Sequence, residues 1–103
     1  MRHREKLDII NKICEVISNI RNINPTSLMF RANLSPETFK DYRKELIEKK
    51  FIKEIRLPKG SLVNGRKTRK DLVSFKLTEK GVEYMKFYEK LTTFKEKYGL
   101  DEK

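Results

Sequence analysis

Two helix-start signals that stand eleven residues apart constrain the fold of this chain more than any other feature of its sequence. In each signal a small polar residue precedes a proline: Asn24-Pro25 opens NPTSLMFRAN, and Ser35-Pro36 opens SPETFKDYRKELIEKK. Asn and Ser side chains accept hydrogen bonds from the free N–H groups at a helix start, and proline fits the first turn. The sequence therefore predicts two consecutive short helices.

The apolar residues of both segments predict which side of each helix faces the core. Asn33 and Leu34 lie between the segments and predict a tight turn, so the two helices form a helix-turn-helix unit. Tyr42 fits the inner face by its helical register, which favours a core residue over one that stacks on a base. The predicted inward residues are Leu28, Met29 and Ala32 in the first helix and Phe39, Tyr42, Leu46 and Ile47 in the second.

An amphipathic helix precedes this unit. Its apolar residues recur every three to four positions and predict a helix over residues 4–20. Cys14 lies on this apolar stripe and is interpreted as a small buried hydrophobe rather than a reactive thiol. Ile23 is expected to form one short strand. The stripe consists of Leu7, Ile10, Ile13, Cys14, Ile17 and Ile20.

A β-hairpin is predicted after the helix-turn-helix unit. FIKEIRL and DLVSFKL are rich in β-branched and aromatic residues, and they flank a loop that contains Pro58, Gly60 and Gly65. In the second strand, Val73, Phe75 and Leu77 alternate with Leu72, Ser74 and Lys76, a period that is typical of a strand.

The loop between these strands, within LPKGSLVNGRKTRKDL, is purely positive. Between Pro58 and Lys70 it has no acid. Like charges repel, so the loop is expected to be flexible and extended, ready for an anionic partner. The alternative is a solvated loop without a function. Its cations are Lys59, Arg66, Lys67, Arg69 and Lys70.

TEKGVEYMKFYEKLTTFKEKYG predicts the last helix, with Thr78 as its cap and Gly99 as its stop. Five apolar residues at alternating spacings of three and four form a short heptad seam of the coiled-coil type. Val82, Met85 and Tyr88 lie off this seam and are expected to pack on the body. The seam is predicted to mediate dimerisation; the alternative is that it completes the monomer core. It consists of Tyr84, Phe87, Leu91, Phe94 and Tyr98.

The predicted order of helix, short strand, helix, helix, hairpin and helix resembles a winged helix-turn-helix. ELIEKKFI (45–52) resembles the end of a recognition helix that runs into the first wing strand, and FKLTEKG (75–81) resembles the last wing strand entering the final helix. LMFRANLSPETFKDYRKELIEKKFI further resembles the small archaeal 10a-type proteins, which dimerise through a C-terminal antiparallel coiled coil. Two features depart from that family: Lys50 stands where it usually has glycine, and the last helix is shorter than its coiled-coil arm.

The resemblance implies an α+β, mainly α fold with a β-hairpin wing and a C-terminal dimerisation helix. Residues 1–78 would form the DNA-binding domain and residues 79–103 the dimerisation helix. The recognition helix, residues 36–50, would enter the major groove, and the wing, residues 58–70, would lie on the adjacent backbone or in the minor groove, where Arg66 or Arg69 could enter. Besides the wing cations, the expected DNA-binding residues are Arg31, Thr38, Lys40, Arg43 and Lys44.

The acids of the recognition helix have two interpretations. Glu37 or Asp41 could accept a hydrogen bond from cytosine. Alternatively, they only stabilise the helix terminus and pair with Lys44. The cations Lys40, Arg43 and Lys44 are expected to contact phosphates more often than bases.

Charge and composition narrow the function. The 103 residues carry a net charge of +10, and residues 71–103 are neutral, so the whole excess lies in residues 1–70. One cysteine permits no intramolecular disulfide and no cysteine zinc cluster, and His3 has no neighbouring ligand that would indicate a metal site. We expect no enzyme activity, no cofactor, no bound metal and no membrane span, and a cytoplasmic, nucleoid-associated location.

The sequence therefore favours sequence-dependent binding of double-stranded DNA by a homodimer that acts as a transcriptional regulator. One alternative is a nucleoid or architectural protein with little sequence preference. Another is a winged-helix module for protein interaction, against which the five cations of the wing argue. RNA binding is disfavoured because no platform of exposed aromatic residues is evident.

Overall fold

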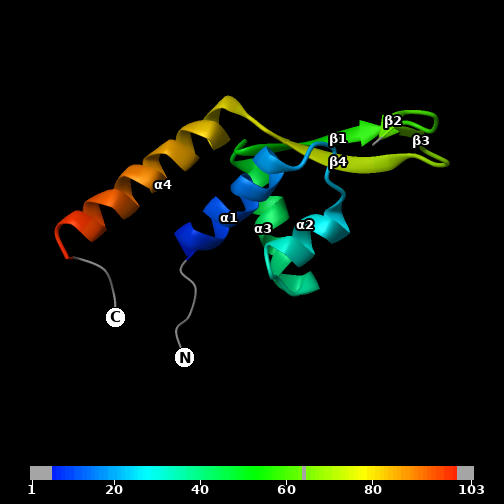
Figure 1. Cartoon of the computed structure of the whole chain (residues 1–103). Helices are drawn as coiled ribbons and strands as arrows, with labels where there is room; N and C mark the ends of the chain where they lie inside the picture. Colours follow the sequence, from blue (N-terminus) through cyan, green and yellow to red (C-terminus); the bar gives the residue numbers. More distant parts are fainter. Residues whose placement is uncertain (1–5, 64, 100–103) are drawn as a thin grey trace.

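The chain folds into a helical body with a β-hairpin at one end and a helical arm at the other (Figure 1). The computed structural model describes residues 6–63 and 65–99, and this part measures 51 × 27 × 25 Å. It has the mainly helical α+β architecture that was predicted. In chain order the elements are α1 (Lys6–Asn19), α2 (Pro25–Arg31), α3 (Pro36–Glu48), β1 (Ile52–Leu57), β2 (Leu62–Val63), β3 (Arg66–Lys67), β4 (Leu72–Leu77) and α4 (Glu79–Lys97).

Both predicted helix starts are confirmed. The Asn24 side chain accepts a hydrogen bond from the Ser27 N–H at 2.7 Å, and the Ser35 hydroxyl accepts one from the Thr38 N–H at 3.3 Å. The turn between α2 and α3 passes through Asn33 at φ 58°. Asparagine tolerates this left-handed conformation better than most residues, so the tight turn forms without a glycine.

The end of α3 uses the same conformation at a residue that is less suited to it. Lys50 has φ 64°, and the following Phe51 N–H donates to the Leu46 carbonyl at 2.9 Å. Glycine is the usual residue for such a helix end because it lacks the Cβ that crowds the left-handed region. Lys50 therefore keeps the backbone geometry that a glycine at this position would adopt more easily.

The core lies where the three helices of the body meet the hairpin. Each of the predicted inward helix faces contributes to it, with Met29, Tyr42 and Ile47 only partly buried at its edge. Phe39 of α3 meets Phe75 of β4 edge-to-face, with ring centroids 6.5 Å apart. Cys14 is fully buried, and this burial raises the pKa of its thiol to about 12. The thiol therefore stays protonated and acts as the small hydrophobe that was predicted.

The hairpin is confirmed, but the predicted short strand at Ile23 is wrong. β1 and β4 pair antiparallel from Ile52↔Leu77 to Leu57↔Leu72. Ile23 is not in a strand. Instead, the Ser74 hydroxyl donates a hydrogen bond of 2.9 Å to the Ile23 carbonyl. Ser74 is consequently buried, because α3 covers one face of β4 while the α1–α2 connection covers the other.

The start of α4 is locked onto the end of α3. The Thr78 hydroxyl accepts from the Gly81 N–H at 3.1 Å and donates toward the carbonyls of Lys50 and Phe51 at 2.5 and 3.0 Å. Gly81 is buried against this turn: a Cβ at this position would lie 2.2 Å from the Phe51 carbonyl oxygen. α4 then ends before Gly99, which has φ 66°, as predicted.

The first half of α4 packs on the body through tyrosines. The Tyr84 hydroxyl donates to the Leu7 carbonyl at 2.6 Å, and its ring lies against Phe51 at 5.6 Å between centroids. Tyr88 donates to the Asp8 carboxylate. Met85 packs on the core as predicted, but Val82 stays 40% exposed. Burial raises the pKa of Tyr84 to about 12, so this hydroxyl remains a donor at any physiological pH.

Candidate nucleic-acid interface

The outward face of α3 carries lysines whose charges are free. Lys40 and Lys44 are exposed and lie one turn apart. In the described part of the chain no ion pair neutralises either of them, and neither Glu37 nor Asp41 pairs with Lys44. Thr38 is half-buried and accepts a hydrogen bond from the Ser35 hydroxyl at 2.9 Å, as part of the helix cap. The two lysines are therefore the side chains of this face that are available to a polyanion.

Arg43 differs from these lysines because it already has partners. Its guanidinium lies 2.9 Å from the Glu54 carboxylate of β1 and 5.2 Å from the centroid of the Phe75 ring. These contacts join α3 to both long strands of the hairpin. A guanidinium held in this way still has donors for a phosphate, but it also fixes the hairpin beside α3.

The loop from 57 to 72 is not the open, extended segment that was expected. β2 and β3 pair within it as a small second hairpin, with Leu62 opposite Lys67 and Val63 opposite Arg66. Backbone hydrogen bonds join Gly60 and Ser61 to Thr68 at 3.0 and 2.9 Å. Gly60 and Gly65 supply the positive φ values, 92° and 79°, that the turns require. The wing is therefore an ordered hairpin despite its like charges.

Polar side chains replace an apolar core at the base of this wing. The Asp71 carboxylate accepts from the Lys59 N–H at 2.8 Å, and the Ser61 hydroxyl donates to the Pro58 carbonyl at 2.7 Å. Asp71 is the only acid between residues 55 and 78, and it is occupied by the backbone. It therefore organises the wing without forming an ion pair with a wing side chain in the described part of the chain.

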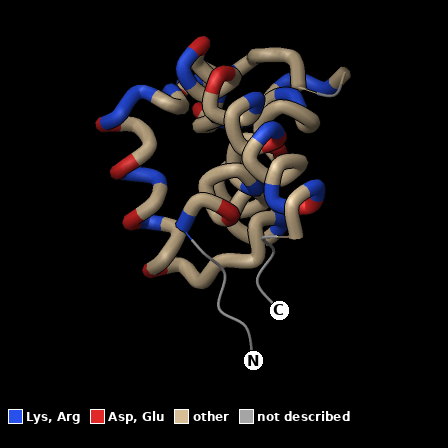
Figure 2. Tube along the Cα trace, turned by 90° about the vertical axis from the view of Figure 1, so that its left-hand side faces the viewer, with Lys and Arg blue, Asp and Glu red and all other residues tan. Residues whose placement is uncertain are grey.

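The wing cations are left facing solvent. The sequence from Pro58 to Lys70 holds no acid, whereas acids and bases both occur along the helices (Figure 2). Phosphates attract such charges irrespective of base sequence. The exposed cations of the wing are Lys59, Arg66, Lys67, Arg69 and Lys70.

The predicted DNA-binding residues did not include one cation that lies between α3 and the wing tip. Arg56 is exposed on β1, and it shares a strand face with Ile52 and Glu54 because side chains alternate. Glu54 contacts Arg43 of α3, so this face is the one turned toward α3. The buried residue Ile52 marks the strand face that Arg56 shares. The sequence did not reveal this face, because the apolar residues of FIKEIRL fall on both faces of the strand.

Arg31 is not grouped with these cations. It is exposed at the end of α2 and lines a shallow surface pocket whose other residues, among them Lys12 and Asn19, belong to α1 or follow it directly. No residue of α3 or of the described wing lines that pocket. The structure thus places Arg31 beside α1, while it places Lys40, Lys44, Arg43 and Arg56 along α3 and the adjoining strand.

An apolar stripe runs along the outer half of α4. Phe87, Phe94 and Tyr98 are 55%, 51% and 58% exposed, and Leu91 is half-buried. The rings of Phe94 and Tyr98 lie 4.7 Å apart and line a concave patch on the helix surface. Tyr84 was expected to belong to this stripe, but it faces its own body. The four remaining residues form an apolar stripe that the body leaves largely uncovered.

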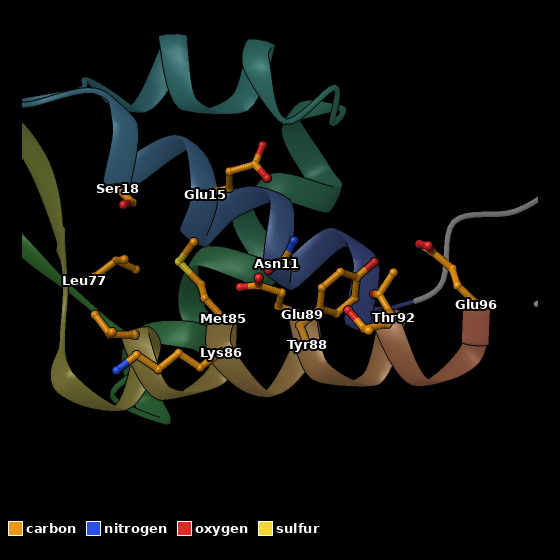
Figure 3. A pocket seen from close by; sticks show the side chains of 12 residues that line it. Asn11, Glu15, Ser18, Leu77, Met85, Lys86, Tyr88, Glu89, Thr92 and Glu96 are labelled. Carbon is orange, nitrogen blue, oxygen red and sulfur yellow. The ribbon is translucent and has the colours of Figure 1, made fainter. Parts of the chain in front are cut away.

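A groove separates α1 from α4 on another side of the arm (Figure 3). It encloses about 600 Å³. Leu77 and Met85 line it near the hairpin, and its charged lining residues are three acids, Glu15, Glu89 and Glu96, and one cation, Lys86. No cation of α3 or of the wing lines this groove, so it is no part of the basic surface.

Comparisons with known proteins agree with this geometry. A family profile described as winged helix-turn-helix matches residues 3–97. The structure of a cysteine-to-serine mutant of Lactococcus lactis ZitR is similar with a TM-score of 0.58 and 19% sequence identity, over 99% of this chain and 67% of that one. None of the curated protein sequences compared with the chain matches it significantly.

Three further expectations bear on the site. His3 lies outside the described residues. Within the described ranges no cluster of three or more His, Cys, Asp or Glu side chains could hold a metal ion, and no helix combines the length and apolar character needed to cross a bilayer.

The matching profile spans α1 to α4 and the whole wing. The chain belongs to the winged helix-turn-helix family.

Proposed function

We propose that this chain binds double-stranded DNA in a sequence-dependent manner and acts as a transcriptional regulator. The observation that carries the proposal is a set of cations on α3, β1 and the wing that form no ion pair within the described residues. The one acid beside them in the wing, Asp71, accepts a hydrogen bond from a backbone N–H instead. Membership of the winged helix-turn-helix family supports the same function. A binding protein of this kind needs no catalytic constellation.

In the proposed complex, α3 lies in the major groove and the wing lies on the adjacent backbone or in the minor groove. Lys40 and Lys44 would reach phosphates or the acceptor edge of guanine. Arg56 would continue the phosphate contacts from α3 toward the wing tip. Arg43 would hold the hairpin at a fixed angle to α3, so that both elements meet the duplex together. Arg31 would contact a phosphate apart from this surface, because it lies beside α1.

A mobility-shift titration of several genomic fragments at two salt concentrations tests this proposal. A regulator binds some fragments much more tightly than others at both concentrations. Equal affinity for all fragments supports instead a nucleoid-associated architectural protein, which the sequence-independent charge of the wing would serve equally well. Absence of binding at low salt refutes both and leaves the protein-interaction module.

We further propose that the chain forms a homodimer through α4. Phe87, Leu91, Phe94 and Tyr98 form the surface, and residues 79–103 would thus serve dimerisation while residues 1–78 bind DNA. Burying apolar area gains about 25 cal/mol per Å², so three large side chains that are half exposed represent several kcal/mol. A second copy related by a two-fold axis buries such a stripe against itself. The likeness to the 10a-type proteins supports this mode, and two bodies would then address half-sites about one helical turn, or a multiple of it, apart.

Sedimentation equilibrium of the wild type and of a Phe94→Glu/Tyr98→Glu variant tests the dimer. Both side chains are more than half exposed, so the charges do not enter the core and the variant is expected to stay folded as a monomer. Phe30→Glu is the matched control, because Phe30 is 83% exposed on α2 and lies outside the stripe. A wild type that remains monomeric at tens of micromolar contradicts the proposal.

A further inference from the structure

The wing tip carries an apolar side chain that the proposed phosphate contacts do not use. Leu62 of β2 is 68% exposed and does not pack on the hydrophobic core. A single exposed leucine is ordinary on a protein surface. What distinguishes Leu62 is its place, at the end of the molecule opposite α4 (Figure 1) and in the middle of the most basic segment of the chain.

Leu62 is held by a stiff backbone. It pairs across the small hairpin with Lys67, so the leucine and a lysine project from the same face. The neighbouring Ser61 carbonyl accepts from the Thr68 N–H at 2.9 Å, and the Gly60 N–H donates to the Thr68 carbonyl at 3.0 Å. These bonds hold the backbone that carries Leu62 without any help from the hydrophobic core.

We infer that Leu62 is a wedge that enters the minor groove and partly unstacks one base step of the bound duplex. This inference rests on the proposed DNA binding. Apolar wedges of this kind insert between bases and kink the duplex, and they require a rigid support because unstacking opposes insertion. The cations around the tip would bind the phosphates on both sides of the step, while the leucine methyl groups leave water and contact the bases.

The wedge gives the wing a means of discrimination that lysine and arginine contacts to phosphates lack. Pyrimidine–purine steps unstack and kink more readily than other steps. A wing with Leu62 inserted therefore favours sites that place such a step beneath its tip, even without a hydrogen bond to a base. A purely electrostatic wing has no such preference.

Two substitutions in the full chain separate a wedge from a charged contact. Leu62→Ala shortens the side chain, and Leu62→Lys keeps a long side chain but adds a cation. The probe is a duplex with fluorophores at its ends, which reports bending, and a second duplex carries 2-aminopurine at the step under the wing, located first by footprinting. Val82→Ala, an apolar truncation of a partly exposed residue on α4, is the control, and melting temperatures confirm that each variant is folded.

The inference predicts that wild type shortens the end-to-end distance and raises the 2-aminopurine fluorescence. Both effects should disappear in Leu62→Ala and Leu62→Lys but persist in Val82→Ala, and Leu62→Ala should bind about tenfold more weakly. Tighter binding by Leu62→Lys with an unchanged bend, or fluorescence that is the same in wild type and Leu62→Ala, overturns the wedge while DNA binding stands. If the wild type binds no duplex, the proposed function fails and the wedge fails with it.

Discussion

Replacing Gly81 with alanine should destabilise the protein, although the same change stabilises most helices. In an exposed helix interior alanine is more favourable than glycine by about 1 kcal/mol. At Gly81 the added Cβ would lie 2.2 Å from the Phe51 carbonyl oxygen and 3.2 Å from a methyl carbon of Leu77. The oxygen belongs to backbone that accepts hydrogen bonds from the Thr78 N–H at 3.1 Å and the Thr78 hydroxyl at 3.0 Å, so it cannot move without weakening both.

The magnitude follows from these contacts. Overpacking a close contact costs about 1–3 kcal/mol, and each weakened hydrogen bond costs about 1 kcal/mol more. After subtracting the gain in helix propensity, Gly81→Ala should lower the free energy of unfolding by about 2–4 kcal/mol, which lowers the melting temperature by roughly 10–30 °C. Glu83→Ala, at an exposed position of the same helix, should change it little.

Urea unfolding of wild type, Gly81→Ala and Glu83→Ala measures this difference, and one chain concentration for all three keeps any contribution from association comparable. A Gly81→Ala variant as stable as wild type, or more stable, would refute the close docking of α4 on the end of α3. The same docking gives a physical reason for the glycine in FKLTEKG, the segment that resembles other winged helices.

Lys50→Gly should leave the free energy of unfolding unchanged or raise it by up to about 1 kcal/mol, because glycine adopts the left-handed conformation without strain but also gives the unfolded chain more entropy. Lys49→Gly, at a helical φ of −83°, should lower the free energy of unfolding in the same urea titration. Hydrogen bonds from Lys6 and then Lys49 hold the pKa of the Glu45 carboxyl below its usual 4.5. A carboxyl group whose pKa is lower in the folded than in the unfolded state stabilises the fold at pH values above the unfolded-state pKa. This contribution disappears as the pH falls through the folded-state pKa. The stability difference between wild type and Glu45→Gln should therefore be larger at neutral pH than at about pH 3, and a difference that grows with acidification would contradict the Lys6–Glu45 contact.

The parts of the fold that the sequence could predict are those decided by neighbours along the chain. Asn24 and Ser35 cap helices because the donors they satisfy lie three residues away, and Thr78 does the same for α4. Apolar periodicity likewise identified the inner face of α3. Such signals are short-range, so no tertiary contact can easily reverse them.

The features that the sequence did not predict depend on contacts between segments that lie far apart in the chain. Ser74 is buried because it reaches Ile23, 51 residues earlier, which strand alternation cannot reveal. The wing folds because the Asp71 carboxylate binds the N–H of a residue twelve positions away, whereas its charge alone predicted an open loop. The position of Tyr84 in the heptad seam of α4 is compatible with packing on a partner or on its own body. Its contact with Phe51 shows that it packs on the body.

The salt dependence of DNA binding by a wing variant tests the proposed interface most directly. In the variant four wing cations become alanine; in a control, four lysines of α4 become alanine, so that both proteins have the same net charge. The wing cations to be replaced are Arg66, Lys67, Arg69 and Lys70, and the control lysines are Lys86, Lys90, Lys95 and Lys97.

If the wing lies on DNA, the wing variant should bind every sequence more weakly. The slope of log affinity against log salt should become shallower by about 0.9 for each phosphate that the wing no longer neutralises. Its melting temperature should stay near that of the wild type, since these side chains are exposed, and the α4 control should keep the wild-type slope. A wing variant with unchanged affinity and slope, or a control whose affinity and slope fall as much as those of the wing variant, would contradict DNA binding through α3 and the wing.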